Sequence, residues 1–128
     1  MIDIDGFKDY NDAFGHMAGD EALRTVSNLL AASVRSTDIV ARYGGEEFVI
    51  LLLGADKAPA FKVAESIRAR IEAHPFQYET QPNTDGLTVS IGVASYPTDG
   101  KTRKDLLYAA DMACYRGKRE GKNRVVEA

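Results

Sequence analysis

Residues 38–53 read DIVARYGGEEFVILLL, and this stretch decides the fold. Two runs rich in apolar and β-branched residues, 38–43 and 46–53, flank the pair Gly44-Gly45. Such runs joined by adjacent glycines are typical of two antiparallel strands in a β-hairpin. The glycines need only form a tight turn, but because they carry no side chain they would also let a ligand approach the backbone closely.

The rest of the chain alternates strand patterns with helix patterns. Residues 1–5 alternate apolar and acidic residues and indicate the end of a strand, after which a turn-rich stretch runs to Gly19. Residues 87–95 predict another strand. Apolar residues at helical spacing predict three helices. These helices start at Asp20, near Phe61 and near Thr102, a polar loop is expected at 81–86, and a short last strand is expected at 123–126.

This order, β-α-β-β-α-β-α with a short final β, predicts an α+β fold of the ferredoxin-like or palm type, built on a split β-α-β unit. We expect a mostly antiparallel central sheet with helices on one face. In that topology the first strand lies antiparallel to the third, so Asp3 and Asp5 lie beside Glu46 and Glu47. Converging carboxylates repel one another, and Mg²⁺ held by carboxylates would neutralise them. Two solvated acidic loops are the alternative interpretation.

Composition limits the class of protein. The 128 residues suit one domain, 1–128, with a core of its own. The net charge of −3 disfavours bulk binding of nucleic acid, although basic residues gather at 116–124, either as a solvated helix end or as a phosphate site. The longest apolar run, 48–53, is too short to cross a bilayer, and the lone Cys114 cannot form an internal disulfide. We therefore expect a cytoplasmic protein that does not insert directly into a membrane.

Several ordered motifs resemble the GGDEF family of diguanylate cyclase catalytic domains. RYGGEEF at 42–48 is similar to the family signature in its Glu-for-Asp form, and IDIDGFK at 2–8 resembles the motif before it. The family usually begins earlier, with a further helix and an Asp-x-Leu-Thr-Gly-Leu motif. The resemblance therefore implies a domain truncated at its N-terminus, from a larger sensory protein that could itself be membrane-anchored. Further matching segments are Asn11-Asp12, Gly15-His16, Gly19-Asp20, VSIGVA at 89–94, Ala110-Asp111 with Tyr115, and GKN at 121–123.

The resemblance implies an enzyme that condenses two GTP molecules into cyclic di-GMP and two pyrophosphates. A homodimer would bring the two GTP molecules face to face. Two magnesium ions per active site, with Mn²⁺ as a possible substitute, would be held by Asp3, Glu46 and the backbone carbonyl of Ile4. Glu46 and Glu47 are the implied catalytic residues, and Glu46 is also the family's proposed base for the attacking 3′-hydroxyl.

The resemblance also implies the substrate contacts. Asn11 and Asp20 would bind guanine, whose edges suit an amide and a carboxylate, whereas an isolated Asp20 would be a helix N-cap. Position 122 is a lysine, whereas the family commonly has arginine there. Lysine cannot bind a phosphate in the bidentate geometry that arginine offers. Gly44 and Gly45 would contact the substrate at the hairpin. The phosphates would be bound by a glycine-containing bend and two lysines, namely Gly6, Phe7, Lys8, Lys118 and Lys122.

Arg35 and Asp38 resemble the family's RxxD site, at which the product cyclic di-GMP inhibits the enzyme, although Asp38 equally suits a turn. The second arginine that often accompanies this site is replaced by Ser66, with Arg68 nearby. Two other functions stay open at this point. One is a non-catalytic receptor for GTP or cyclic di-GMP, and the other is a cyclase that acts on a single nucleoside triphosphate.

Overall fold

The structure is a computed structural model that describes residues 1–76 and 86–128, so the polar loop expected at 81–86 lies almost wholly outside the described residues. None of the described helices is both long and apolar enough to cross a bilayer. In chain order the elements are β1 (Ile2–Ile4), α1 (Phe7–Phe14), α2 (His16–Ala32), β2 (Ile39–Arg42), β3 (Glu47–Leu51), α3 (Lys57–Glu72), β4 (Val89–Val93), α4 (Arg103–Arg119) and β5 (Arg124–Glu127).

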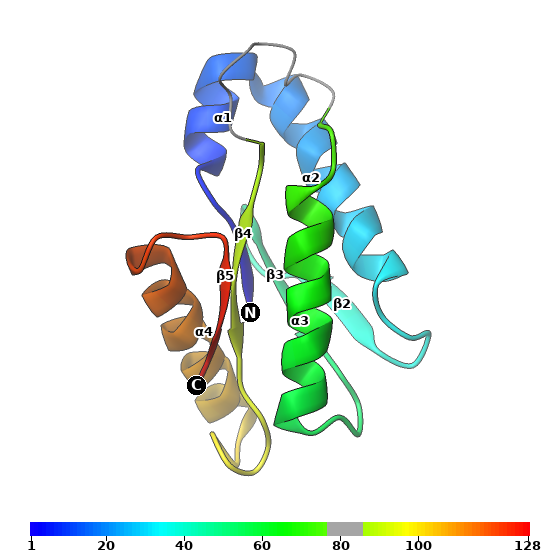
Figure 1. Cartoon of the computed structure of the whole chain (residues 1–128), viewed down its shortest axis with the longest axis vertical. Coiled ribbons are helices and arrows are strands. Elements are labelled where there is room, and N and C mark those ends of the chain that lie inside the picture. The colour runs from blue at the N-terminus through cyan, green and yellow to red at the C-terminus, as the bar shows by residue number, and fades with distance from the viewer. Residues whose placement is uncertain (77–85) are drawn as a thin grey trace.

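The strands form one sheet with the order β2-β3-β1-β4-β5 (Figure 1). β1 pairs antiparallel with β3 and with β4, β2 pairs antiparallel with β3, and β4 pairs parallel with β5. The predicted α+β class and the mostly antiparallel sheet are therefore confirmed. The register sets Asp3 opposite Glu47, and the N–H of Ile4 donates to the carbonyl of Glu46 at 3.2 Å. The expected convergence of the two acidic segments is confirmed for Asp3, whereas the carboxylate of Asp5 accepts from the hydroxyl groups of Thr88 and Ser90 on the β4 side of β1.

Helices cover both faces of the sheet, so the expectation of helices on one face is wrong. Ile2, Phe48 and Ile91 lie in a core shared with α1, α2 and α3. On the opposite face, Gly92 lies directly against the backbone of α4, where an added Cβ would be 2.5 Å from the nitrogen of Cys114. All five residues of β4 are buried, and a strand buried on both sides needs cover on both faces of its sheet.

The segment expected to be rich in turns is helical. Gly6 and Gly15 have positive φ angles of 63° and 89°, and they bound α1 at its two ends. Phe7 and Tyr10 are buried on the inner face of α1, and the rings of Tyr10 and Phe14 lie 4.9 Å apart. α2 therefore begins at His16 and places Asp20 inside the helix, so the interpretation of that residue as an N-cap is wrong.

The hairpin turn spans residues 43–46 and is longer than the glycine pair alone. The N–H groups of Tyr43 and Gly44 both donate to the carbonyl of Glu47, at 2.8 and 3.3 Å. The guanidinium of Arg42 closes the turn by donating to the carbonyl oxygens of Gly44 and Gly45, in its shortest bond at 2.7 Å. The two glutamates that follow are thus held at the start of β3.

Candidate active site

The carboxylate assigned to metal binding lies where β1, β3 and α4 meet. One oxygen of Asp3, Oδ2, forms an ion pair with the Nζ of Lys118 at 2.6 Å. Its other oxygen, Oδ1, is buried and has no hydrogen-bond partner among the described residues. A buried carboxylate oxygen without a partner is costly, because it has lost its hydration and gained nothing in return. This oxygen is therefore available to a cation.

Burial disfavours the charged forms of both Asp3 and Lys118, whereas neighbouring charges affect the pKa values of the two groups differently. Burial raises the pKa of Asp3, and although Lys118 opposes that rise, the charges of Glu46 and Glu47 add to it. Burial is the largest effect on Lys118 and disfavours its ammonium, but the hydrogen bond to Asp3 and the nearby negative charges together outweigh burial and raise the pKa of Lys118. The lysine is thus satisfied by the pair and the carboxylate is not. The carboxylate is also the more buried of the two groups, because its side chain is 14% exposed against 32% for the lysine.

A hollow of about 290 Å³ opens beside the ion pair. Glu47 lines it, and the carboxylate of Glu47 lies over Gly44, where an added Cβ would collide with its Oε2. Glu46 does not line the hollow, although its charge acts on Asp3. The lining also includes α4 residues that sequence reasoning did not assign, although 111, 115 and 118 have the i, i+4, i+7 spacing of one helix face. The lining residues are Asp3, Glu47, Asp111, Met112, Cys114, Tyr115 and Lys118.

The donors present suit magnesium bound together with a nucleotide. Within residues 1–76 and 86–128, no three acidic, histidine or cysteine side chains come together as a metal cage. Mg²⁺ is usually held by one or two carboxylates plus substrate phosphates, and it needs no cage made of protein alone. The unpartnered oxygen of Asp3 beside the hairpin glutamates fits that pattern. The share of Ile4 in holding the metal stays a prediction.

The residues assigned to guanine lie on α1 and α2. The Oδ1 of Asn11 is buried and has no partner in the described part of the chain. Gly19 lies directly against this amide, and an added Cβ there would be 2.8 Å from the Cγ of Asn11 and closer still to its Oδ1. Gly19 is therefore required for this approach, and sequence reasoning quoted it in a motif without giving it a role. Asp20 is the exposed neighbour of Gly19.

The phosphate-binding residues assigned by resemblance lie at two helix ends. Gly6 begins α1, and no described side chain caps that end of the helix. The first N–H groups of a helix have no acceptor within it, so Phe7 and Lys8 contribute to an end that favours anions. Lys122 lies just after α4 in a turn where it and Asn123 have φ angles of 63° and 47°. Assigning these groups to phosphate stays a prediction.

Arg35 and Asp38 form a bidentate ion pair just before β2. Nε and Nη2 of Arg35 donate to the two oxygens of Asp38 at 3.1 and 2.9 Å, and the N–H of Leu53 donates to Asp38 at 3.1 Å. The side-chain hydrogen bonds from Arg35 lower the pKa of Asp38 to about 2. The side chain of Arg35 is 62% exposed and that of Asp38 is 2% exposed, so the guanidinium is the accessible part of the pair.

Arg68, two residues after Ser66, is held by three other side chains. Its guanidinium donates to Glu65 at 3.1 Å, to Glu72 at 2.7 Å and to the side-chain oxygen of Asn123 at 2.9 Å. These contacts hold Arg68 along α3 and against the turn after α4. The side chain is therefore committed to the fold.

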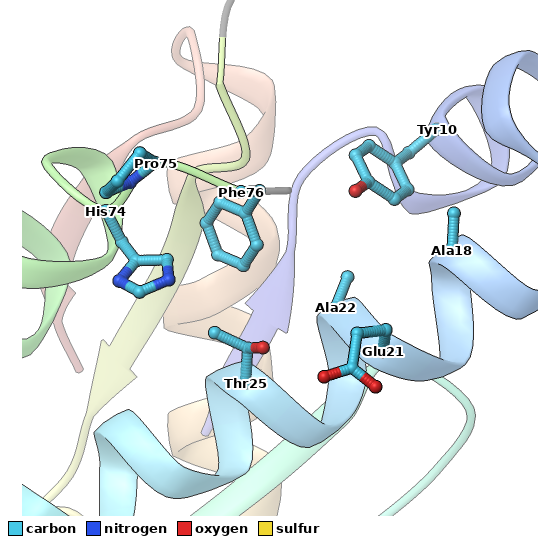
Figure 2. Close-up of a pocket in the computed structure, with 8 residues that line it drawn as sticks. All are labelled: Tyr10, Ala18, Glu21, Ala22, Thr25, His74, Pro75 and Phe76. Carbon is cyan, nitrogen blue, oxygen red and sulfur yellow. The ribbon is translucent and has the colours of Figure 1, made fainter. Parts of the chain in front are cut away.

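A second hollow, of about 270 Å³, lies between α2 and residues 74–76. Figure 2 shows the rings of Tyr10, His74 and Phe76 around it, with Glu21 and Thr25 on α2. No residue assigned to the active site is among the described residues that line it. This hollow is separate from the candidate site.

Comparison with known proteins agrees with the fold. Residues 1–124 match the family described as "Diguanylate cyclase, GGDEF domain". The chain is 42% identical over 125 residues to diguanylate cyclase A of Treponema denticola, an alignment that covers 98% of this chain and 33% of that protein. The chain belongs to the GGDEF family of diguanylate cyclase domains.

Solved structures of the family share the fold. The GGDEF domain of YfiN (TpbB) from Pseudomonas aeruginosa superposes with a TM-score of 0.91 at 38% identity, covering 99% of this chain and 78% of that one. The GGDEF domain of DgcB from Caulobacter crescentus, solved in complex with c-di-GMP, superposes with a TM-score of 0.85 at 31% identity, covering 98% and 74%. The chain spans about a third of the length of its curated Treponema relative, so the activity of the whole protein is a matter for proposal.

Proposed function

We propose that this chain is a diguanylate cyclase domain that condenses two GTP molecules into cyclic di-GMP and two pyrophosphates. One observation supports this most directly. Asp3 lies beside the glutamates of the hairpin and is fixed by Lys118 through one oxygen, while its other oxygen is buried without a partner among the described residues. A domain that had lost its catalytic role would have no need to keep such a costly group.

Magnesium is the cofactor that these donors suit. Asp3 and Glu46 would hold it with the carbonyl of Ile4, and Mn²⁺ would find the same oxygen donors. When bound, the metal supplies positive charge that neutralises the triphosphate and polarises its phosphoryl oxygens. Lys118 already faces Asp3 at 2.6 Å, so it adds a second positive charge at the place where the phosphates would lie.

The chain's own residues would orient the substrate. Asn11 presents a buried amide oxygen and Asp20 an exposed carboxylate, which together match donors on guanine. The uncapped start of α1, at Gly6, Phe7 and Lys8, would receive the terminal phosphates. Gly44 and Gly45 leave room for the nucleotide at the hairpin, and Lys122 would add positive charge from the turn after α4.

The reaction would need two domains face to face, as a homodimer with one GTP in each. The 3′-oxygen of one GTP attacks the α-phosphorus of the other, a P–O bond forms, and the bond to pyrophosphate breaks. The hydroxyl proton passes to a base, for which Glu46 is the candidate, while Glu47 shapes the site from β3. Most of the rate gain would come from positioning and from charge neutralisation.

Arg35 and Asp38 would form a second site, at which cyclic di-GMP slows the enzyme. The exposed guanidinium of Arg35 offers a planar donor to guanine or phosphate, and Asp38 holds it in place. We place the reaction in the cytosol, where GTP is supplied, within a longer sensory protein.

The test is turnover at several dilute protein concentrations with GTP and Mg²⁺, followed by chromatography of the products. We expect cyclic di-GMP to form at a rate that rises with about the square of the concentration, because two domains must meet. Glu46→Gln should abolish turnover, and Asp56→Asn, which changes an exposed carboxylate before α3, serves as the control. Binding of GTP without release of pyrophosphate would contradict the proposal and favour a receptor.

A further inference from the structure

Asp5 is a buried carboxylate for which the proposed reaction gives no role. The residue is 8% exposed, and within the described chain no lysine or arginine forms an ion pair with it. Three hydrogen bonds satisfy it instead. Oδ1 accepts from the hydroxyl of Ser90 at 2.7 Å, and Oδ2 accepts from the hydroxyl of Thr88 at 2.8 Å and from the backbone N–H of Asn123 at 3.0 Å. A buried charge without a cation is retained only where such bonds hold it.

These bonds join the two places to which phosphate binding is assigned. Asp5 directly precedes Gly6, where α1 begins, and its own N–H donates to the carbonyl of Thr88 at 2.8 Å. At the other side of its carboxylate, the Asn123 N–H belongs to the turn that carries Lys122. The side chain of Asp5 thus connects the start of α1 to the turn after α4, although Asp5 and Asn123 are 118 positions apart in the chain.

The turn needs such a tie. Lys122 and Asn123 both adopt positive φ angles, which L-residues disfavour and which persist only where surrounding bonds fix them. The side chain of Asn123 is anchored to α3, where it accepts from Arg68 at 2.9 Å and donates to Glu72 at 2.8 Å. Its backbone N–H is anchored to Asp5 alone in the described structure. The carboxylate therefore fixes the backbone at the residue next to Lys122.

We propose that Asp5 is a positioning residue, which holds the turn 121–123 so that Lys122 meets the phosphates gathered at the start of α1. This inference rests on the proposed function, because it needs the phosphates to be bound there. Asp5 touches neither substrate nor metal in this role and acts through Lys122. A purely structural Asp5 would stabilise the sheet without favouring one nucleotide over another.

The test compares a triphosphate with a monophosphate in the presence of Mg²⁺. Calorimetric titration would use the α,β-methylene analogue of GTP, which cannot be cleaved at that bond, and GMP. We expect Asp5→Asn to weaken the analogue about tenfold, the loss of one charge-assisted hydrogen bond, and to change GMP less than about twofold. Asp56→Asn makes the same carboxylate-to-amide change at the exposed residue before α3, whose side chain makes no cap hydrogen bond, and should change neither affinity.

Two further readouts separate positioning from a general loss of structure. Lys122→Met should weaken the analogue about tenfold in the wild-type background and less than about twofold in the Asp5→Asn background, because loss of the bond from Asp5 to the turn would already have displaced Lys122. The amide proton of Asn123 should resonate far downfield in the wild-type protein and lose that shift in Asp5→Asn. If Asp5→Asn does not fold, the double variant Thr88→Val/Ser90→Ala keeps the charge, loosens the carboxylate, and should weaken the analogue while leaving GMP unchanged.

Equal weakening of GMP and the analogue would overturn the inference, as would additive effects of the lysine and aspartate variants. If the wild-type protein and Lys122→Met behave as expected while Asp5→Asn binds normally, the inference alone fails. If the wild-type protein shows no preference for the triphosphate analogue, the proposed phosphate site fails and the inference falls with it.

Discussion

Replacing Gly92 by alanine tests how closely α4 has to approach the sheet. An added Cβ at this position would lie 2.5 Å from the backbone nitrogen of Cys114 and 3.0 Å from the carbonyl carbon of Ala110, with the carbonyl oxygen closer still. All of these are backbone atoms, so no side chain can rotate to make room. The helix itself has to retreat.

The size of the effect follows from these distances. Ordinary contact begins at 3.4 Å, so α4 has to withdraw by roughly 1 Å or more along its contact with β4. Overpacking of this kind costs about 3 kcal/mol of unfolding free energy, the upper end of the usual range, because backbone has to move. At this chain length that corresponds to a fall in melting temperature of roughly 12 °C. The same retreat lengthens the 2.6 Å ion pair between Lys118 and Asp3.

The assay is urea unfolding at equilibrium, followed by circular dichroism, together with the rate of cyclic di-GMP formation. Gly45→Ala is the stability control, because an added Cβ there meets no atom of the described residues within 4 Å, and it should stay within about 0.5 kcal/mol of wild type. A Gly92→Ala protein less than about 1 kcal/mol destabilised would refute the reasoning, since α4 could then not be packed backbone to backbone on β4.

Three further outcomes follow from charge and burial. In Arg35→Ala the pKa of Asp38, lowered to about 2 by its bonds to Arg35, should return toward about 4 by NMR titration. Because the pKa of Asp38 is lower in the folded protein than in the unfolded chain, its bonds to Arg35 stabilise the fold above about pH 4. This stabilisation is lost as pH falls from about 4 to 2, so Arg35→Ala should lose less stability than wild type over that range. Burial raises the pKa of Cys114 to about 11, so the native thiol should react slowly with a disulfide reagent at pH 8, and a rapid burst would contradict its burial. Burial also raises the pKa of Asp3, so the folded protein loses stability relative to the unfolded chain as pH rises above about 4, the ordinary pKa of an aspartate. Asp3→Asn should remove this contribution to the pH dependence of the unfolding midpoint, and it should abolish turnover.

The strands could be predicted because their sequence patterns lie within short segments of the chain. The stretch 38–53 contains its own turn, and the later strand and helices carry clear periodicity. α1 was missed because Gly6 and Gly15 suggest breakers, whereas they bound a helix that is only eight residues long. The second layer of helices was missed for a different reason. Covering both faces depends on how α4 packs on β4, which is a tertiary contact through Gly92 and leaves no periodic signal.

Part of the active site could also be predicted from the sequence, and part could not. Topology alone placed Asp3 beside the hairpin glutamates, because antiparallel neighbours bring one strand's end to the other's start. The role of Asp5 could not be predicted, since its side-chain partners Thr88 and Ser90 lie 83 and 85 positions away in the chain. Gly19 also looked like a loop residue until the amide of Asn11 was found against it.

The position of the Lys118 charge at the site is set by small residues of α4 and of the sheet beneath it. The face of α4 toward the sheet consists of small residues, with Ala113 and Gly117 buried, and an added Cβ at Gly117 would come within 3.3 Å of Val126. Together with Gly92 they let the helix backbone lie directly on β4 and β5. Lys118 follows the last of these small residues and is thereby brought within 2.6 Å of Asp3. A bulkier residue in this contact would leave every proposed catalytic group chemically intact and still separate the lysine from the carboxylate, because close packing under α4 determines the electrostatics of the site.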